Sequence, residues 1–163
     1  MNSGSILVGV VLVLICTAPF IILNQQRKRK KNNRLKTINY EANKLQCKID
    51  THEFCGNYLI GIDSNKKVVF FNKELKEQPE ENTIELSLYK KCYINTQYIN
   101  LKTKDHSFKE IETLSLAFIP IVKNKPEVKL EFYNTDINMM LSGELASIKK
   151  WENRINELLV TKA

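Results

Sequence analysis

The chain has 163 residues and a mass of 18.9 kDa, which suits one ordinary domain and an appendage. Its formal net charge is +7, yet seven basic residues lie between positions 27 and 36, and residues 37–163 sum to zero. A neutral domain argues against nucleic-acid binding, which normally requires a basic face, and 43% hydrophobic residues argue against a disordered chain.

The first elements predicted are a membrane anchor and its topology signal. Residues 6–23 carry no charge and would span about 27 Å as a helix, close to a bilayer core of roughly 30 Å. No basic residue precedes them and no small-x-small cleavage site follows, so residues 1–26 are predicted to be an uncleaved transmembrane anchor. The basic residues that follow are Arg27, Lys28, Arg29, Lys30, Lys31, Arg34 and Lys36.

The position of this basic cluster predicts the orientation of the chain. Positive charge concentrates on the cytoplasmic side of membrane spans, and here it lies only after the span. We therefore expect a single-pass protein of the bacterial inner (plasma) membrane, with the amino terminus outside and the carboxyl-terminal domain cytoplasmic. The cluster would act as a topology determinant or, alternatively, would also contact anionic lipid at the membrane surface.

Residues 27–47 are predicted to form a basic juxtamembrane segment and an amphipathic helix. Apolar residues recur at intervals of three and four, at Leu35, Ile38, Ala42, Leu45 and Ile49. This stripe would pack against the chain's own domain or lie on the membrane surface. Alternatively, Leu35, Ile38, Leu45 and Ile49 would form a homodimer, as a short coiled coil does.

Residues 48–163 are predicted to form an antiparallel domain closed by a helix. Alternating patterns predict strands at 58–63, 68–71, 84–88, 92–101, 114–118 and 128–132, with polar loops at 73–82 and 102–110. Ser142 is a candidate cap for the last helix. The apolar face of this helix comprises Leu145, Ile148, Trp151, Ile155, Leu158 and Leu159. Trp151, at the centre of that face, is predicted to anchor the core.

This order of elements resembles a pleckstrin-homology-like (PH-like) barrel over residues 48–160. The sequences IGID (60–63), VVFFNK (68–73), LEFYN (130–134), GEL (143–145) and KKW (149–151) are similar to those of an uncharacterised bacterial family of single-span membrane proteins. The resemblance implies the same anchored arrangement and brings no activity. The predicted fold class is α+β: a transmembrane helix, a connecting helix, a PH-like sheet or barrel of five to seven strands, and a carboxyl-terminal amphipathic helix.

Residues that could carry chemistry are few. The chain has four cysteines and two histidines, and the spacings of Cys47, His52, Cys55 and Cys92 match no zinc finger or ribbon. No nucleotide-binding, metalloprotease or calcium-loop motif occurs in the sequence. We expect no catalytic residues, cofactor, metal or nucleic acid.

The function predicted from the sequence is that of a membrane-anchored cytoplasmic binding or scaffold domain. It would recruit a protein partner by strand addition or helix docking. The alternative is a membrane-tethered enzyme or small-ligand sensor, whose site is assembled from residues that are distant in the sequence.

Overall fold

The computed structural model describes residues 3–102, 107–138 and 140–160, and it describes side chains for Leu12 and, within those ranges, for 16–100, 108–138 and 140–160. The chain divides into two units, residues 1–37 and residues 38–163. Helix α1 (Ser3–Lys44) runs without a break across this division. Its last turns, from Ile38 onward, therefore belong to the second unit.

The structure corrects the prediction of a membrane anchor. In the part of the chain that it describes, no helix is both long enough and apolar enough to cross a membrane. The longest uninterrupted apolar stretch of α1 with described side chains, residues 16–23, extends for only about 12 Å of helix. The predicted single-pass anchor at 6–23, and the inner-membrane localisation derived from it, are therefore contradicted.

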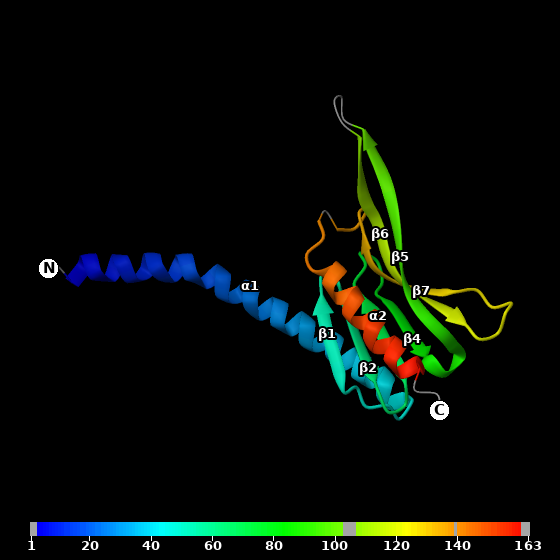
Figure 1. Ribbon diagram of the computed structural model, residues 1–163. Helices are drawn as coiled ribbons and strands as arrows, with labels where there is room; N and C mark the ends of the chain where they lie inside the picture. The colour runs from blue at the N-terminus through cyan, green and yellow to red at the C-terminus, as the bar shows by residue number, and fades with distance from the viewer. Residues whose placement is uncertain (1–2, 103–106, 139, 161–163) are drawn as a thin grey trace. The chain divides into compact units, whose positions relative to one another are not determined.

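Seven antiparallel strands form two separate sheets (Figure 1). The first sheet contains β1 (Thr51–Cys55), β2 (Tyr58–Asp63), β3 (Val68–Lys73) and β4 (Glu80–Glu85), in that order. The 3-10 turn η1 (Leu86–Leu88) leads into the second sheet, which contains β5 (Tyr89–Lys102), β6 (Ser107–Pro120) and β7 (Val128–Asn134). The α+β class holds, but the PH-like barrel is wrong, because the strands described form two sheets and not one closed ring.

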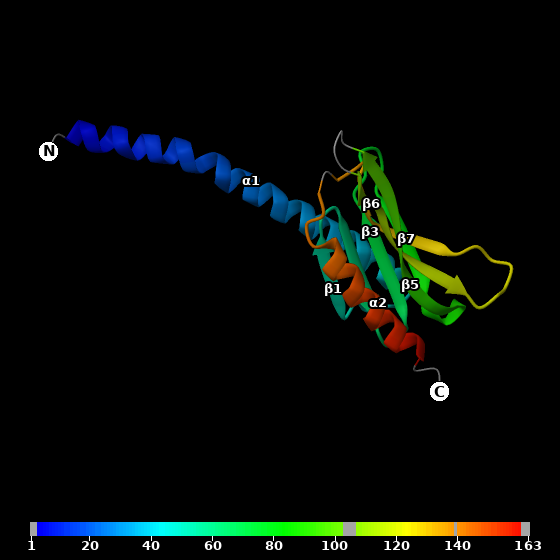
Figure 2. The same ribbon diagram turned by 45° about the horizontal axis from the view of Figure 1, so that its top comes forward.

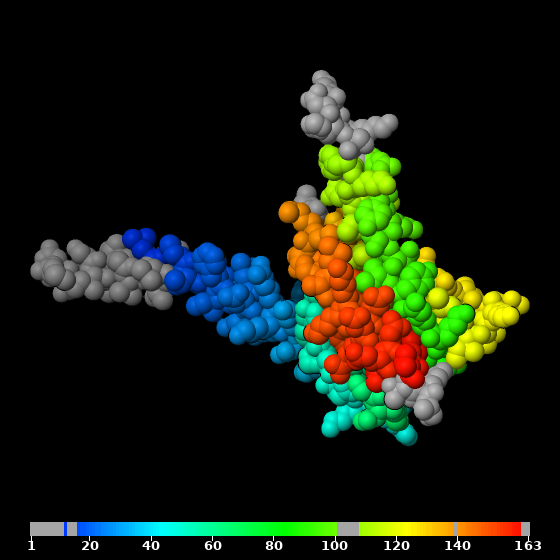
Figure 3. Space-filling model, viewed as in Figure 1, coloured from blue at the N-terminus to red at the C-terminus, as the bar shows by residue number. Residues whose placement is uncertain are grey.

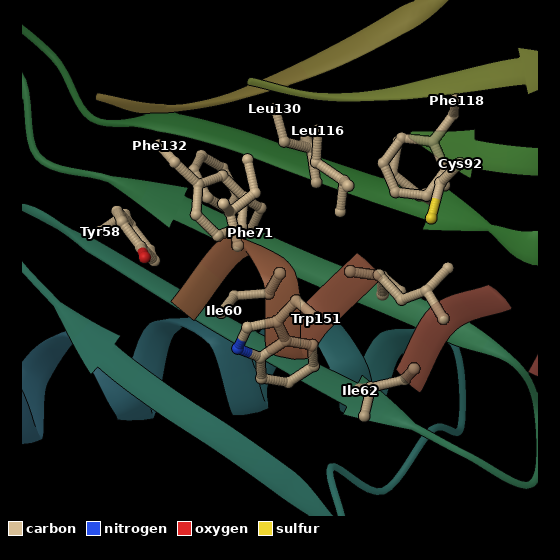
Figure 4. Packing of buried hydrophobic residues seen from close by; sticks show 14 of the residues in the cluster. Tyr58, Ile60, Ile62, Phe71, Cys92, Leu116, Phe118, Leu130, Phe132 and Trp151 are labelled. Atoms are coloured by element: carbon tan, nitrogen blue, oxygen red, sulfur yellow. The ribbon is translucent and has the colours of Figure 1, made fainter. Parts of the chain in front are cut away.

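The hydrophobic core lies between these two sheets and under α2 (Glu144–Val160) (Figure 4). Alternating residues of β2 and β3 face alternating residues of β6 and β7, as expected for strands with one apolar face. The rings of Tyr58, Phe71 and Phe132 pack together, with centroids 4.5–5.6 Å apart. This cluster joins the two sheets.

The first sheet is buried on both faces, which the alternating pattern did not predict. Every residue of β2 and β3 is buried, including Leu59 and Phe70 on the face away from the core. Ile38 and Ala42 at the end of α1 are also buried, whereas Leu45 is 45% exposed. Part of the stripe predicted for dimerisation is therefore already buried within this unit.

Helix α2 lies alongside β1 of one sheet and β5 of the other (Figures 1 and 2). Trp151 is completely buried, and its indole N–H donates to Glu53 of β1 over 3.1 Å. Lys150 pairs with the same carboxylate at 2.8 Å. The helix begins at Glu144, and the Ser142 hydroxyl bonds to the Glu144 side chain instead of capping a backbone N–H.

Candidate functional site

The seven basic residues predicted to set membrane topology all lie on α1. Six of them are exposed and Arg34 is half-buried. They belong to the unit that ends at residue 37, apart from the folded strands. No ligand or surface role is assigned to them by the contacts described.

The cysteines and histidines considered as metal ligands do not form a site in the described structure. No group of three or more His, Cys, Asp or Glu side chains among the described residues could hold a metal ion. Cys47 and Cys92 are buried free thiols, and the His52 ring packs edge-on against Phe54 at 5.9 Å. His106 lies outside the described residues. Burial raises the pKa of the Cys92 thiol to about 12, which makes it a poor nucleophile at neutral pH.

A small polar cluster lies where the β1–β2 turn meets the start of α2. It contains the Cys55 thiol and the buried hydroxyls of Tyr58 and Ser147, neither of which makes a hydrogen bond of normal geometry with a described residue. Burial raises the pKa of the Cys55 thiol, and nearby Glu144 and Glu53 raise it further. Because burial also raises the pKa of Tyr58, the cluster holds neutral groups and offers no activated nucleophile.

The turn in this cluster requires glycine. Gly56 has a positive φ of 51°, and a Cβ atom at this position would lie 2.6 Å from a carboxylate oxygen of Glu144. Glu144 is itself buried and accepts hydrogen bonds from the backbone N–H and the hydroxyl of Ser142. This arrangement connects the turn to the helix start and explains the residues of the cluster as structural ones.

The outer edge of β5 is covered by α2 over only part of its length. The side-chain amide of Asn156 accepts from the backbone N–H of Cys92 and donates to its carbonyl, both at 3.0 Å. These are the two bonds that an adjacent strand would make. Glu152 accepts from the backbone N–H of Ile94 at 3.2 Å. In this way α2 takes the place of a neighbouring strand at residues 92 and 94.

Beyond Ile94 the same edge is open. Backbone groups of a strand alternate in direction with a period of two, so Thr96, Tyr98 and Asn100 direct their N–H and C=O groups outward, like Cys92 and Ile94. Among the described residues, no side chain or strand takes the role of Asn156 and Glu152 at these positions. Tyr98 is 58% exposed and Ile99 is 39% exposed.

This open edge belongs to a two-stranded ribbon that extends past the rest of its sheet (Figures 1 and 3). β7 pairs with β6 only as far as Thr113, whereas β5 and β6 stay paired for five further residue pairs, from Tyr98–Ile111 to Lys102–Ser107. Phe108 on the ribbon is 50% exposed. Two strands alone are marginally stable in water, so the ribbon would gain from a third strand.

The open part of β5 also lacks the charges that normally protect a sheet edge. No charged residue occurs between Lys91 and Lys102. In contrast, edge strand β4 carries Glu80, Glu81 and Glu85, and edge strand β7 carries Lys129 and Glu131. The unprotected edge at residues 96–100 is therefore the clearest binding feature of the described structure.

A polar cavity of about 330 Å³ lies on the neighbouring face of the second sheet. All its lining residues are polar or charged: Glu80, Asn95, Gln97, Thr113, Ser115, Lys129 and Glu131. The completely buried Lys73 pairs with Glu131, whose second carboxylate oxygen accepts from Asn134 at 3.1 Å. The cavity lacks the apolar wall that small-molecule sites usually have.

Sequence reasoning found part of this site and missed the rest. Residues 92–101 were expected to be a strand, but residues 102–110 were expected to be a polar connection, whereas β6 already begins at Ser107. The ribbon was missed because Ser107, Lys109 and Glu110 have no apolar alternation. The run of ten uncharged residues from 92 to 101 was the available signal.

Comparisons with known proteins add no relative for this chain. No family model matches it, no curated protein matches it, and no solved structure matches it.

Proposed function

We propose that the unit beginning at Ile38 is a protein-binding module, which takes up an extended segment of a partner by strand addition along β5. The observation that carries this proposal is the open, uncharged backbone edge at Thr96, Tyr98 and Asn100. α2 covers the same edge at Cys92 and Ile94 through Asn156 and Glu152. The binding site would therefore begin where the cover provided by α2 ends.

Strand addition matches the chemistry of this edge. Main-chain hydrogen bonds would supply affinity without requiring a particular partner sequence, and alternate side chains would supply specificity. On one face the added strand would lie beside Tyr98, and on the other beside Gln97 and Ile99. The exposed aromatic and aliphatic groups favour a partner with apolar residues at alternate positions.

Binding of a small polar ligand is the second candidate, and the cavity lined by Asn95, Lys129 and Glu131 is the observation that favours it. Its groups could bind only a ligand rich in hydrogen-bonding atoms. Glu131 is already occupied on both oxygens by Lys73 and Asn134. With so much of its hydrogen-bonding capacity used internally, the cavity supports a ligand less well than the open edge supports a strand.

The test uses ten-residue peptides displayed on phage and selected against the full chain. Selected peptides are then titrated into the wild-type protein, Tyr98→Pro and Tyr98→Phe by calorimetry. Proline removes the outward N–H at position 98, whereas phenylalanine keeps it and keeps the ring. We expect at least a tenfold loss of affinity for Tyr98→Pro and less than a threefold change for Tyr98→Phe.

Thermal unfolding of each variant shows whether the domain is still folded. Equal binding by a folded Tyr98→Pro variant would contradict strand addition at β5. Peptides whose binding is instead lost on Lys129→Ala would assign the interaction to the polar cavity.

A further inference from the structure

The exposed segment of β5 is chemically suited to pair with itself. Residues 95–100 read Asn-Thr-Gln-Tyr-Ile-Asn, with no charge, no proline and no glycine. Amide and hydroxyl side chains both donate and accept hydrogen bonds, so identical segments satisfy one another. Short uncharged segments of this type are those that associate most readily with copies of themselves.

We propose that the strand received by the β5 edge is β5 of a second copy of this chain. This inference rests on the proposed function and names its partner. A twofold axis at Tyr98 would pair the two strands antiparallel, with Tyr98 opposite Tyr98 and Thr96 opposite Asn100 of the other copy. The two three-stranded sheets would then join into one continuous sheet of six strands.

The register is limited at one end by α2. Because Asn156 and Glu152 already occupy the edge at Cys92 and Ile94, pairing with a second copy can extend only over residues 96–100 and beyond. Centring the axis on Tyr98 uses all five of these residues in both copies. It also places the most exposed aromatic residue of the described ribbon at the centre of the contact, facing its own copy.

Charge does not oppose this association. Residues 37–163 are neutral overall, and the pairing segment has no charged residue. The same twofold pairing through β4 would bring Glu80, Glu81 and Glu85 close to their own copies, with repulsion across the interface. A five-residue contact is smaller than a standard interface, so we expect a dissociation constant on the order of 100 µM.

The test combines sedimentation with disulfide trapping. Sedimentation equilibrium of the full chain should show a reversible dimer, which Tyr98→Pro abolishes and Tyr98→Phe retains. In a Cys16→Ser background, Tyr98→Cys should form a disulfide-linked dimer in mild oxidant, since directly opposed residues lie within disulfide range. Asn100→Cys is the matched control, because the axis places it opposite Thr96 and far from its own copy.

Each outcome decides between register, partner and mode. Trapping at position 98 without trapping at position 100 supports the twofold pair. Equal trapping at both positions, or a monomer at every concentration, overturns it. If the chain stays monomeric but phage-selected peptides still lose binding on Tyr98→Pro, the second copy is refuted and strand addition stands. If neither binds, both proposals fail.

Discussion

Replacement of Trp151 tests how the carboxyl-terminal helix holds the two sheets together. Its side chain is completely buried between them, and its N–H donates to Glu53. A tryptophan removes roughly 150–250 Å² from water, which corresponds to about 4–6 kcal/mol at 25 cal/mol per Å². Truncation to alanine in a rigid core typically costs about 3–5 kcal/mol, and we expect that loss for Trp151→Ala.

Trp151→Phe separates the ring from its hydrogen bond. Phenylalanine keeps most of the buried area but cannot donate to Glu53, which would retain its pairing with Lys150 at 2.8 Å. We expect a cost of about 2 kcal/mol, the sum of a smaller ring and one bond to a carboxylate.

The assay is urea unfolding at equilibrium, followed through methyl NMR signals of the buried Leu116 and Leu130. These signals report on the core in all three proteins, whereas tryptophan fluorescence would disappear with the only tryptophan. A loss below about 1 kcal/mol for Trp151→Ala would refute the view that this side chain anchors the helix between the sheets.

Three further predictions concern hydrogen bonds and titration. Asn156→Ala leaves the backbone N–H and carbonyl of Cys92 without their partner, so we expect a loss of about 1–3 kcal/mol in urea unfolding; an unchanged stability would show that α2 does not cover this edge. Burial raises the pKa of Asp63, but N–H donors from Lys66, Lys48 and Asn65 outweigh it and hold that pKa below its ordinary value. The Asp63 carboxylate therefore stabilises the fold above its unfolded pKa of about 4, and this contribution disappears as pH falls through its folded pKa, so Asp63→Asn should flatten the acid loss of stability between about pH 5 and 2. An equally steep loss in that variant would contradict the assignment. With a pKa near 12, Cys92 should resist iodoacetamide at pH 8 in the folded protein and react in urea, as peptide mass mapping can check; rapid labelling in the folded state would show that it is not buried.

Local pattern predicted the elements of the domain better than their assembly. The alternation of Val128, Leu130 and Phe132 gave β7, and the spacing from Ile148 to Leu159 gave α2. Both depend on one buried face, which leaves a direct trace in the sequence. The strand starts at Glu80 and Ser107 were missed, because polar edge strands and exposed ribbons leave no such trace.

The division into two sheets could not be predicted from alternation. A single sequence shows which face of a strand is apolar but not which strands pair, and the break between β4 and β5 occurs at a three-residue turn. The burial of Leu59 and Phe70 on a second face depends on the chain reaching this sheet from α1. The membrane prediction rested on hydropathy alone and is not supported by any described helix.

The open edge depends on long-range contacts in the same way. Asn156 and Glu152 are ordinary polar residues on a helix, and only the fold places them against Cys92 and Ile94. The absence of charge from 92 to 101 was visible in the sequence, but it marks an edge only once β5 is known to have one neighbouring strand.

The most direct test of the open edge is amide hydrogen exchange by NMR in a dilute sample. We predict slow exchange at Cys92 and Ile94, whose N–H groups donate to Asn156 and Glu152, and fast exchange at Thr96, Tyr98 and Asn100. Slow exchange at the last three positions in the dilute protein would show that the edge is already covered, and would contradict the account of β5 as a binding site.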